Sequence, residues 1–596
     1  MCGFTGSFSF KNIENQKIKE ANRFCECRGP DNISNLKNED FVNSNLWFNR
    51  LAIIDLSINA NQPMKSKLSN SILLFNGEIY NSKNLKEKLL HDKYPFVTSH
   101  SDTEVLLAGL EIFGIDFINK LEGQFAFVYW KKDVNKIYMA RDRVGQKPLY
   151  YSINNTTFNF SSNLKSVLKL TNKLEIREDS VSNYLIRGAN FTPSTLFENI
   201  FKVERASYII IDYSSGQFKE NKIQYWNEER YINNLKFNEE EFIELFQDSV
   251  LKRLISDVPI ATFCSGGLDS TSIIQAQYNN DITVNTFSVT FEDKKNNEKN
   301  YIDKVVEKFN TNHTEILFKN SEIFESVDKA IESLDEPYSD PSIVPTYVIS
   351  QLISKNYKVA ISGDGGDELL GGYERMKNHL KKRNSLTELI YSISKFYPPY
   401  LGTGTSFTSR SKNYEEAYFS YFEDKNFQNY VTGKTLEDLN FLNFDALGSI
   451  YKSILKSEYN YYLSDQMMYK VDRMSMANSL EVRSPFVDNK LIEYIFSHDT
   501  NYLSLDTQKL PILNYLKPNF GSSFLNRPKQ GFVFDYKQWV SLNRDFIIDT
   551  IASSETKNYL NFKNLIRISR IPTRINSLRI WKVYVLSKYF HSLNNL

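Results

Sequence analysis

The sequence predicts two domains of different fold class, an α+β domain followed by an α/β domain. The chain has 596 residues, and a single hydrophobic core stops growing at roughly 250 to 300 residues, so more than one domain is expected. Short β-rich runs between Asn, Gly and Asp turns fill the first part of the chain. After about residue 240, strands and helices alternate, which is typical of a parallel sheet.

The first domain is expected over residues 2–200. Runs of β-forming residues at 71–75, 125–130 and 136–140 predict strands, and residues 103–113 predict a helix between them. Short turns connect these runs, so the pairing should be mainly antiparallel. The polar stretch that follows contains no repeat or low-complexity tract, and we expect a packed domain boundary there.

The second domain is expected over residues 235–596. A strand at 258–263 leads into a glycine turn at Ser265 and a helix from Ser270. The elements that we expect after it are strand 284–291, helix 300–309, strand 314–318, helix 321–334, strand 358–361 and a mostly helical stretch over 380–540. Ligands of such sheets bind beyond the carboxyl ends of the strands, which is where the glycine turns at Ser265 and Ser362 fall.

Composition excludes several classes of protein. The 72 basic and 71 acidic side chains leave a net charge of +1, which favours neither a nucleic-acid nor a membrane partner. The sequence shows no signal peptide and no run of about 18 apolar residues, so we expect a cytoplasmic protein. Four cysteines and six scattered histidines predict neither a disulfide framework nor a structural metal site.

Cys2 is the first candidate for a catalytic residue. Removal of Met1 would make it the terminal residue, with its own α-amine, which titrates near 8, available as a base. A lone cysteine is more often a small buried apolar residue, so the assignment depends on other residues.

Five motifs follow Cys2 in a characteristic order. They are Arg28-Gly-Pro-Asp31, Arg50-Leu-Ala-Ile-Ile-Asp55, Asn76-Gly-Glu-Ile-Tyr-Asn81, Ser101-Asp-Thr-Glu104 and Ala140-Arg-Asp-Arg143 with Lys147-Pro-Leu-Tyr-Tyr151. With these motifs the chain resembles class II glutamine amidotransferases, and in particular the glutaminase half of the asparagine synthetase family. The resemblance implies an N-terminal-nucleophile glutaminase sandwich of αββα layers.

The same resemblance implies roles for five further residues. Asn76 and Gly77 would donate hydrogen bonds to the oxyanion that forms when the terminal thiol attacks the glutamine amide. Arg50 would bind the glutamine carboxylate through its two-pronged guanidinium. Glu78 and Asp102 would bind the glutamine ammonium group.

The motif Ser265-Gly-Gly-Leu-Asp-Ser270 indicates a phosphate site. It follows an apolar strand and opens a helix, so glycines admit a phosphate closely and helix N–H groups face it. It resembles the pyrophosphate loop of ATP pyrophosphatases, which implies an α/β parallel-sheet domain that uses ATP and Mg²⁺. The implied pyrophosphate-binding residues are Ser265, Gly266, Gly267, Asp269 and Ser270.

Other residues of this half match the asparagine synthetase family as well. Asp269 and Asp367 would hold the metal, and Lys529, in Arg527-Pro-Lys-Gln-Gly-Phe532, would follow charge on the α-phosphate. Asp364 stands where some members have Glu and would act in adenylation or ammonia handling. The residues implied around the AMP portion are Phe263, Val289, Ser362 and Gly363.

These observations predict glutamine-dependent asparagine synthesis. Ammonia from glutamine would displace AMP from an adenylated aspartate, giving asparagine, AMP, pyrophosphate and glutamate. Amidation of another carboxylate, such as a sugar acid of a surface polysaccharide, stays open as an alternative. A ring-closing synthetase of the β-lactam synthetase type and a non-catalytic protein on the same scaffold are less consistent with the motifs. Small molecules are the expected partners, and a homodimer is left open.

Overall fold

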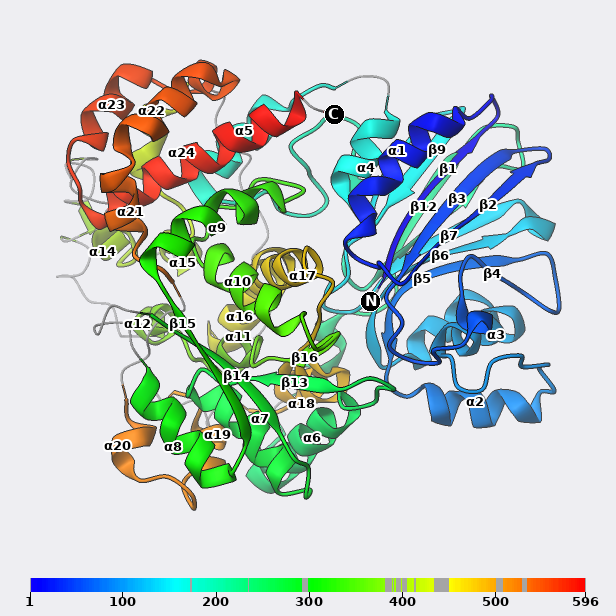
Figure 1. Cartoon of the computed structure of the whole chain (residues 1–596), viewed down its shortest axis with the longest axis horizontal. Helices are drawn as coiled ribbons and strands as arrows, with labels where there is room; N and C mark the ends of the chain where they lie inside the picture. The colour runs from blue at the N-terminus through cyan, green and yellow to red at the C-terminus, as the bar shows by residue number, and fades with distance from the viewer. Residues whose placement is uncertain are drawn as a thin grey trace.

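The computed structural model describes residues 2–171, 174–233, 235–291, 298–380, 389, 391–392, 398, 403, 405–411, 414–432, 450–499, 508–527, 533–594 and 596. The chain forms an all-antiparallel sandwich on one side and a parallel sheet with many helices on the other, and its N-terminus lies between the two halves (Figure 1).

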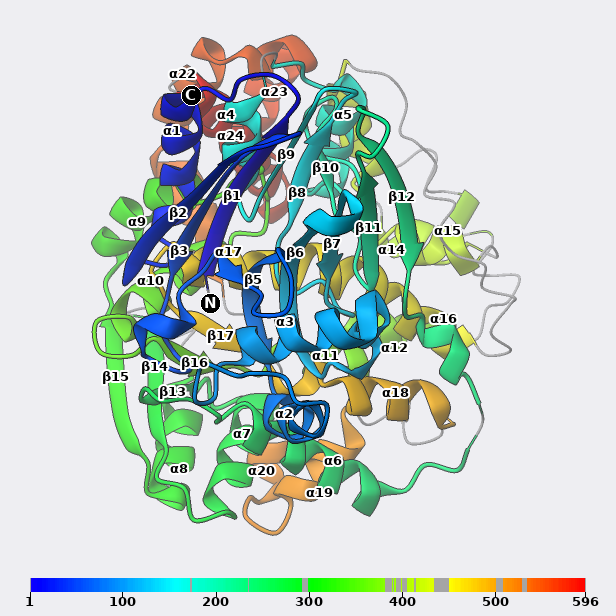
Figure 2. The ribbon, with the colours of Figure 1, turned by 90° about the vertical axis from the view of Figure 1, so that its right-hand side faces the viewer.

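Two six-stranded sheets make up the sandwich. The first has the order β10-β8-β9-β1-β3-β2, with β1 (Cys2–Ser9), β2 (Asn32–Glu39), β3 (Asn43–Arg50), β8 (Tyr150–Ile153), β9 (Thr157–Ser161) and β10 (Phe201–Lys202). The second has the order β12-β11-β7-β6-β5-β4, with β4 (Met64–Lys65), β5 (Ile72–Ile79), β6 (Gly123–Lys131), β7 (Lys136–Arg141), β11 (Ser207–Asp212) and β12 (Lys219–Gln224). Figure 2 shows the sandwich from its outer side.

Apolar side chains from both sheets meet between them and form the core of the sandwich. Phe8 of β1 and Phe160 of β9 come from the first sheet, and Trp130 of β6 and Met139 of β7 come from the second. Phe8 packs edge-to-face on Trp130, with ring centroids 4.8 Å apart. The strands alternate inward and outward side chains, so this core follows from their period of two.

Helices cover the outer faces of the sandwich. Helices α1 (Asn15–Glu26) and α4 (Leu164–Leu170) pack on the first sheet. Helix α3 (Asp102–Phe113) packs on the second sheet, and α2 (Ser82–His91) packs against α3. The predicted αββα layering is therefore confirmed. The strands predicted at 71–75, 125–130 and 136–140 correspond to β5, β6 and β7, and the predicted helix corresponds to α3.

The second half is built on a five-stranded parallel sheet with the order β15-β14-β13-β16-β17. Its strands are β13 (Ile260–Phe263), β14 (Asn285–Phe291), β15 (Asn312–Phe318), β16 (Val359–Ile361) and β17 (Glu481–Arg483). One face packs against α7 (Leu268–Tyr278) and α8 (Lys299–Phe309), the other against α9 (Asn320–Glu332) and α10 (Ile343–Ile353). The predicted α/β fold is confirmed.

Strand β17 is the element of this sheet that the sequence does not predict, because it lies within the stretch expected to be mostly helical. It has three residues, and two of them, Glu481 and Arg483, carry charges that are fully buried. A short strand with buried charges lacks the apolar pattern by which strands are recognised.

Further helices surround the sheet. They are α5 (Glu178–Arg187), α6 (Glu239–Lys252), α11 (Gly366–Leu370), α12 (Glu374–Leu380), α14 (Thr405–Thr408), α15 (Tyr414–Phe419), α16 (Ile450–Ser457), a π-helix over Glu458–Met467, α17 (Met468–Met476), α18 (Asn489–Ser497), α19 (Leu510–Leu516) and α20 (Ser522–Leu525). Asn238 caps α6, because its side chain accepts hydrogen bonds from the N–H groups of Glu240 and Glu241. None of the described helices has the length and apolarity that crossing a membrane requires.

The C-terminal part of the chain supports the parallel-sheet half. Helix α24 (Arg574–Leu593) packs on α9 and on the small helices α21 (Tyr536–Leu542), α22 (Arg544–Ser553) and α23 (Phe562–Ser569). Trp581, which is fully buried, donates from Nε1 to the carbonyl of Ser339 at 2.9 Å. The tail is therefore part of the folded core.

Candidate active sites

Cys2 is held between the two halves of the molecule. Its backbone nitrogen donates to Asn76 Oδ1 at 2.9 Å, and its carbonyl accepts from Arg28 Nε at 3.2 Å. The Arg28 guanidinium also forms two parallel hydrogen bonds, of 2.8 and 2.9 Å, to the carboxylate of Asp472 in α17. Both domains therefore fix the position of Cys2.

The Cys2 thiol needs a base before it can attack a substrate. Burial raises the pKa of the Cys2 thiol, so the thiol is protonated near neutral pH, whereas the thiolate is the nucleophile. The nitrogen of Cys2, held by Asn76, would become an α-amine if Met1 were removed. This arrangement fits a terminal nucleophile.

Asn76 and Gly77 lie beside Cys2 on strand β5. Asn76 is fully buried, and its Nδ2 has no hydrogen-bond partner in the described part of the chain, although its Oδ1 is used by Cys2. A buried donor without an acceptor destabilises a protein unless a ligand supplies the acceptor. A side chain at Gly77 would meet the Gln124 carbonyl oxygen at 2.1 Å, so glycine allows β6 to pack closely here.

Two buried carboxylates lie near this end of strand β5, Glu78 on the strand itself and Asp102 beside it on α3. Asp102, at the N-terminus of α3, accepts from the backbone N–H of Ile79 at 3.0 Å, and burial raises the pKa of Asp102 to about 6. Burial, and then the charge of Glu481, raises the pKa of Glu78 well above its usual range. A bound ammonium group would stabilise the charged form of both acids.

Arg50 ends strand β3 and pairs in register with Cys2. Its Nη1 donates to the carbonyl of Ser57 at 2.8 Å and to Asn61 Oδ1 at 2.7 Å, and its Nη2 contacts the carbonyl of Asp55. The loop after β3 therefore positions the guanidinium. The carboxylate-binding role of Arg50 remains a prediction.

Strand β17 of the parallel sheet lies close to Glu78 and so to the Cys2 site. Arg483 Nε donates to Glu481 Oε1 at 2.6 Å, and Arg483 Nη2 lies 3.2 Å from Glu78 Oε1. Glu481 Oε1 also accepts from Gln124 Nε2 at 3.4 Å. The parallel-sheet half thus supplies charged groups to the surroundings of Cys2, which the sequence does not reveal.

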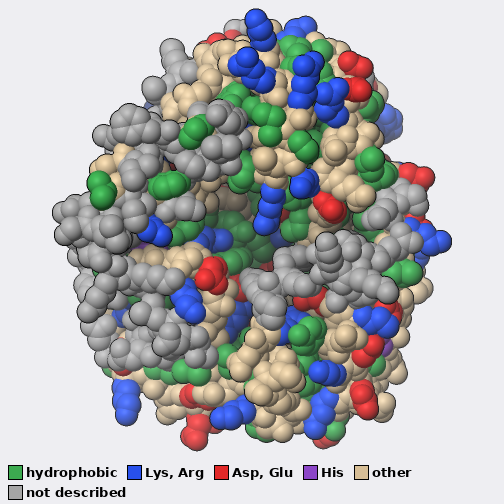
Figure 3. Space-filling model, turned by 90° about the vertical axis from the view of Figure 1, so that its left-hand side faces the viewer, with side chains coloured by type: hydrophobic (Ala, Val, Ile, Leu, Met, Phe, Trp, Pro, Cys, Tyr) green, Lys and Arg blue, Asp and Glu red, His purple; other side chains and the backbone are tan. Residues whose placement is uncertain are grey.

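The second site is a cavity of about 730 Å³ beyond the carboxyl ends of the parallel strands. The predicted residues that line it are Phe263, Ser265, Gly267, Asp269, Ser270, Val289, Ser362, Gly363, Asp364 and Asp367. Gly266 lies in the same turn with φ of +64°, and a side chain there would come within 2.9 Å of the backbone nitrogen of Ile302. The structure therefore brings the predicted phosphate residues together. Figure 3 shows the hollowed face opposite the sandwich.

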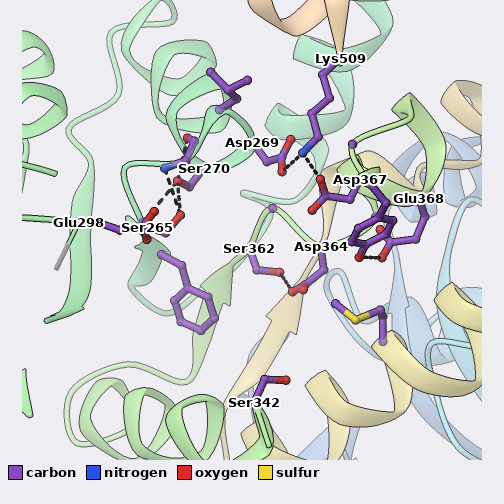
Figure 4. Close-up of a pocket in the computed structure, with 18 of the residues that line it drawn as sticks. Ser265, Asp269, Ser270, Glu298, Ser342, Ser362, Asp364, Asp367, Glu368 and Lys509 are labelled. Atoms are coloured by element: carbon purple, nitrogen blue, oxygen red, sulfur yellow. Dashed lines mark hydrogen bonds and ion pairs between the residues drawn. The ribbon is translucent and has the colours of Figure 1, made fainter. Parts of the chain in front are cut away.

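Lys509 is a residue of this cavity that sequence reasoning missed. Its Nζ contacts the Asp269 carboxylate and lies 2.6 Å from Asp367 Oδ1, between the two (Figure 4). Burial disfavours the charged amine, but the two carboxylates outweigh it and raise the pKa of Lys509. No motif marks Lys509, because it lies 240 residues from Asp269 in the sequence.

The predicted metal site can be tested against these contacts. Asp269 and Asp367 converge on one point where a cation, the Lys509 ammonium, already lies. Two carboxylates with phosphate oxygens and water are the donor set that Mg²⁺ prefers. Among the described residues no group of three or more His, Cys, Asp or Glu side chains forms a metal site, so a bound Mg²⁺ would need further oxygens from water or from the nucleotide.

Two further acidic residues, Asp364 and Glu368, also line the cavity. Ser362 Oγ donates to Asp364 Oδ2 at 2.7 Å. Glu368 accepts from the Tyr373 hydroxyl at 2.5 Å, and burial together with the Asp367 charge raises the pKa of Glu368 to about 7. Lys529, the predicted catalytic cation, lies outside the described residues.

Two family models match the chain and together span most of it. The glutamine amidotransferase domain model matches residues 1–226, and the asparagine synthase model matches residues 241–587. This chain belongs to the asparagine synthase family. The predicted resemblance is therefore confirmed, and the two matches coincide with the sandwich and the parallel-sheet half.

Curated relatives support the same family. Asparagine synthetase [glutamine-hydrolyzing] 1 of Bacillus subtilis (strain 168) is 28% identical over 100% of this chain and 97% of its own length. Putative asparagine synthetase [glutamine-hydrolyzing] 2 of Methanocaldococcus jannaschii is 35% identical over 63% of this chain and 76% of its own. Amidase chry2 of Gibberella zeae is 24% identical over 75% and 73%.

A solved structure of B. subtilis glutamine phosphoribosylpyrophosphate amidotransferase also matches, at 14% identity. The match covers 61% of this chain and 82% of that structure's chain, with a TM-score of 0.29. As a member of the asparagine synthase family, the present protein is an ATP-dependent, glutamine-hydrolysing ligase.

Further charged side chains line the cavity of the parallel-sheet half. Lys470 of α17 lines the cavity and is buried, and its Nζ contacts the Met467 sulfur at 3.5 Å. A thioether is a weak acceptor for an ammonium group. Asp340 and Glu374 line the same cavity. The Lys470 ammonium group could therefore bind a carboxylate in this cavity.

Proposed function

We propose that this asparagine synthase family member makes asparagine from aspartate in the cytoplasm, with glutamine as nitrogen donor and ATP as energy source. The observation that carries the glutaminase step is the Asn76 amide, whose Oδ1 binds the Cys2 nitrogen while its buried Nδ2 remains available for an oxyanion. ATP and glutamine are small intracellular metabolites, which supports the proposed location.

In the glutaminase step, the Cys2 sulfur attacks the glutamine amide carbon and its proton passes to the α-amine. Asn76 Nδ2 and the Gly77 N–H stabilise the oxyanion. The α-amine passes that proton to the amide nitrogen, so ammonia leaves and a thioester forms, and water then hydrolyses the thioester to glutamate. Glu78 and Asp102 hold the glutamine ammonium group, and Arg50 holds its carboxylate.

In the synthetase step, an aspartate carboxylate oxygen attacks the α-phosphate of ATP and pyrophosphate leaves. Phe263, Val289 and Gly363 contact the AMP portion, and the turn at 265–270 binds the pyrophosphate. Asp269 and Asp367 would hold Mg²⁺, which neutralises charge on the phosphates. Ammonia then displaces AMP from the aspartyl adenylate, and Asp364 and Lys529 act on the transferring groups.

Support for aspartate as the acceptor comes from three charged residues that line the cavity. Lys470 suits a carboxylate, and Asp340 with Glu374 suits the ammonium group that an amino acid carries and a sugar acid lacks. The acceptor is thereby proposed to be an amino acid with a second carboxylate.

A product assay tests this proposal. Purified protein is incubated with ATP, Mg²⁺, glutamine and one carboxylate at a time, and AMP, glutamate and amide are quantified. Aspartate should give asparagine and AMP in equal amounts. The panel should include glutamate, diaminopimelate and uronic acids. Amide formation from another acceptor with none from aspartate would disprove the aspartate assignment.

A Cys2→Ala variant separates the two active sites. It should stop releasing glutamate from glutamine but still form the amide with added ammonium salt. Cys27→Ala is a matched control, since Cys27 is an exposed cysteine and its replacement should leave both activities intact. Loss of ammonia-dependent synthesis in Cys2→Ala would contradict the two-site mechanism.

A further inference from the structure

Arg527 is a cation of the nucleotide cavity whose hydrogen-bonding capacity is incompletely used. It follows helix α20, lines the cavity, and is 8% exposed. Its Nη2 lies 3.1 Å from Glu298 Oε1. Its Nη1 is buried without a hydrogen-bond partner in the parts of the chain that the structure describes. A buried guanidinium with an unused donor is expected to have a further acceptor in the functional state.

The guanidinium of Arg527 lies against the N-terminus of α7, an eleven-residue helix. Gly267 is the N-cap residue of that helix, and a side chain built at Gly267 would lie 3.3 Å from Arg527 Nη2. Glycine thus keeps the guanidinium close to the turn. The helix N-terminus and the guanidinium both favour an anion at the same place.

Glu298 is the only ionic partner that the structure gives Arg527 among the described residues, and it faces the same cavity. Figure 4 shows Glu298 beside Ser265, on the opposite side of the turn from Lys509. Burial raises the pKa of Glu298, although the Arg527 charge opposes the shift. A carboxylate so close to a polyphosphate would repel it, so Glu298 does not suit the nucleotide-bound state as the sole partner of Arg527.

Tyr301 fixes the direction of the guanidinium. Its ring centroid lies 4.5 Å from Arg527 Cζ, which is close enough for a cation–π contact. Arg527 can therefore exchange Glu298 for another anion while its stacked plane stays in place. A planar, two-pronged donor is well suited to adjacent phosphate oxygens.

We propose that Arg527 binds the two terminal phosphates of ATP, and hence the leaving pyrophosphate, and that Glu298 is its counter-ion while the site is empty. This assignment rests on the proposed placement of pyrophosphate at the turn of residues 265–270. Arg527 and Lys509 then flank that turn from its two sides. Neither residue would contact the AMP portion.

Calorimetric titration of the full chain tests the assignment. Magnesium pyrophosphate, ATP and AMP are titrated separately, without glutamine or acceptor. Arg527→Gln should bind pyrophosphate and ATP about 10- to 100-fold more weakly, because a charge-assisted hydrogen bond is lost. Its AMP affinity should stay within about 2-fold of the original chain, since AMP lacks the terminal phosphates.

Three further variants sharpen the result. Arg527→Lys keeps the charge and should recover part of the pyrophosphate affinity. Glu298→Gln removes the competing carboxylate and should bind pyrophosphate more tightly than the original chain. Arg544→Gln, a substitution at an exposed arginine of α22, should change none of the three affinities.

The outcomes separate this proposal from the proposed function. Unchanged pyrophosphate affinity in Arg527→Gln would overturn the role of Arg527 while leaving the ATP site intact. An equal loss of AMP affinity in that variant would also overturn it, because Arg527 would then only maintain the shape of the cavity. Failure of the original chain to bind either ATP or AMP would instead refute the proposed nucleotide site.

Discussion

The Arg483 guanidinium lies 3.2 Å from the Glu78 carboxylate, so a strand of the parallel sheet supplies the counter-ion for a buried acid of the sandwich. Both side chains are buried, at 0% and 5% exposure. This contact couples the stability of the glutaminase site to the docking of the second domain.

Replacing Arg483 with Met should destabilise the protein strongly. Glu78 and Glu481 are both buried and would both lose a cation, and breaking a buried ion pair in this way lowers the free energy of unfolding by about 3 to 5 kcal/mol. Urea unfolding, followed at its first transition, measures the change. Arg544→Met breaks an exposed pair with Asp545 and should change stability by less than about 1 kcal/mol. Equal effects of the two substitutions would contradict the argument.

Replacing Asn76 with Asp should separate glutamine use from synthesis. The variant keeps the size of the side chain and an oxygen facing the Cys2 nitrogen, but it loses the Nδ2 donor. Removal of one oxyanion donor lowers the rate by about 10²- to 10³-fold. Glutamate release measures this loss, and amide formation from ammonium salt serves as the internal control. A variant with unchanged glutamate release would exclude Asn76 as the donor.

Asp102 should give glutamine binding a pH dependence near 6. Burial raises the pKa of Asp102 to about 6, so the acid is neutral below that pH and cannot pair with the glutamine ammonium group. KM for glutamine should therefore rise as the pH falls through 6. Asp102→Asn should show a high KM at every pH tested. A KM that is flat between pH 5 and 7.5 in the original chain would contradict the assignment.

Ionisation of Asp102, which favours glutamine binding, should lower the stability of the protein without glutamine. The folded pKa of Asp102 lies above the unfolded value of 3.8, so its stabilising contribution is fully present below pH 3.8 and is lost as the pH rises through 6. Each pKa unit corresponds to about 1.4 kcal/mol, so ionised Asp102 destabilises the apo protein by about 3 kcal/mol near pH 8. Thermal unfolding of Asp102→Asn should thus show a gain over the original chain at pH 8 that shrinks toward pH 4.

The sequence was sufficient to predict those site residues that lie in short motifs on regular elements. Cys2 begins a strand, Asn76 and Gly77 continue another, and the turn at 265–270 joins a strand to a helix. Each of these motifs has its chemistry and its local structure in one stretch. Apolar periodicity predicted the strands and helices of both halves for the same reason, whereas the αββα layering was implied by the family resemblance.

Long-range charge pairing explains what the sequence did not reveal. Glu481 and Arg483 are charged residues in a fully buried strand, and only partners in the other half make that burial possible. Lys509 has an unremarkable local sequence and becomes significant by meeting Asp269 and Asp367. Such residues are recognised only when the tertiary structure brings them to their partners.

Replacing Lys509 with Met should make the melting temperature of the protein depend on Mg²⁺ in the absence of nucleotide. The Asp269 and Asp367 carboxylates would lose the ammonium group between them, so the melting temperature should fall. Added Mg²⁺ should restore it more than in the original chain, because a ligand that binds only the folded state stabilises that state. Lys509→Arg should respond like the original chain, and NaCl of equal ionic strength should not replace Mg²⁺. An equal Mg²⁺ response in all three proteins would argue against these metal ligands.

Replacing Gly77 with Ala should disrupt the sandwich beside Cys2. The new Cβ would lie 2.1 Å from the Gln124 carbonyl oxygen and 2.7 Å from the Phe125 Cα, and both are backbone atoms of β6 that cannot move without breaking the ladder. Overpacking of this kind lowers the free energy of unfolding by about 1 to 3 kcal/mol or more. The melting temperature and the rate of glutamate release should both decrease. Gly521→Ala is the matched control, since no atom lies within 4 Å of its added Cβ. A Gly77→Ala protein as stable and active as Gly521→Ala would show that β5 and β6 can separate here without loss of the oxyanion site.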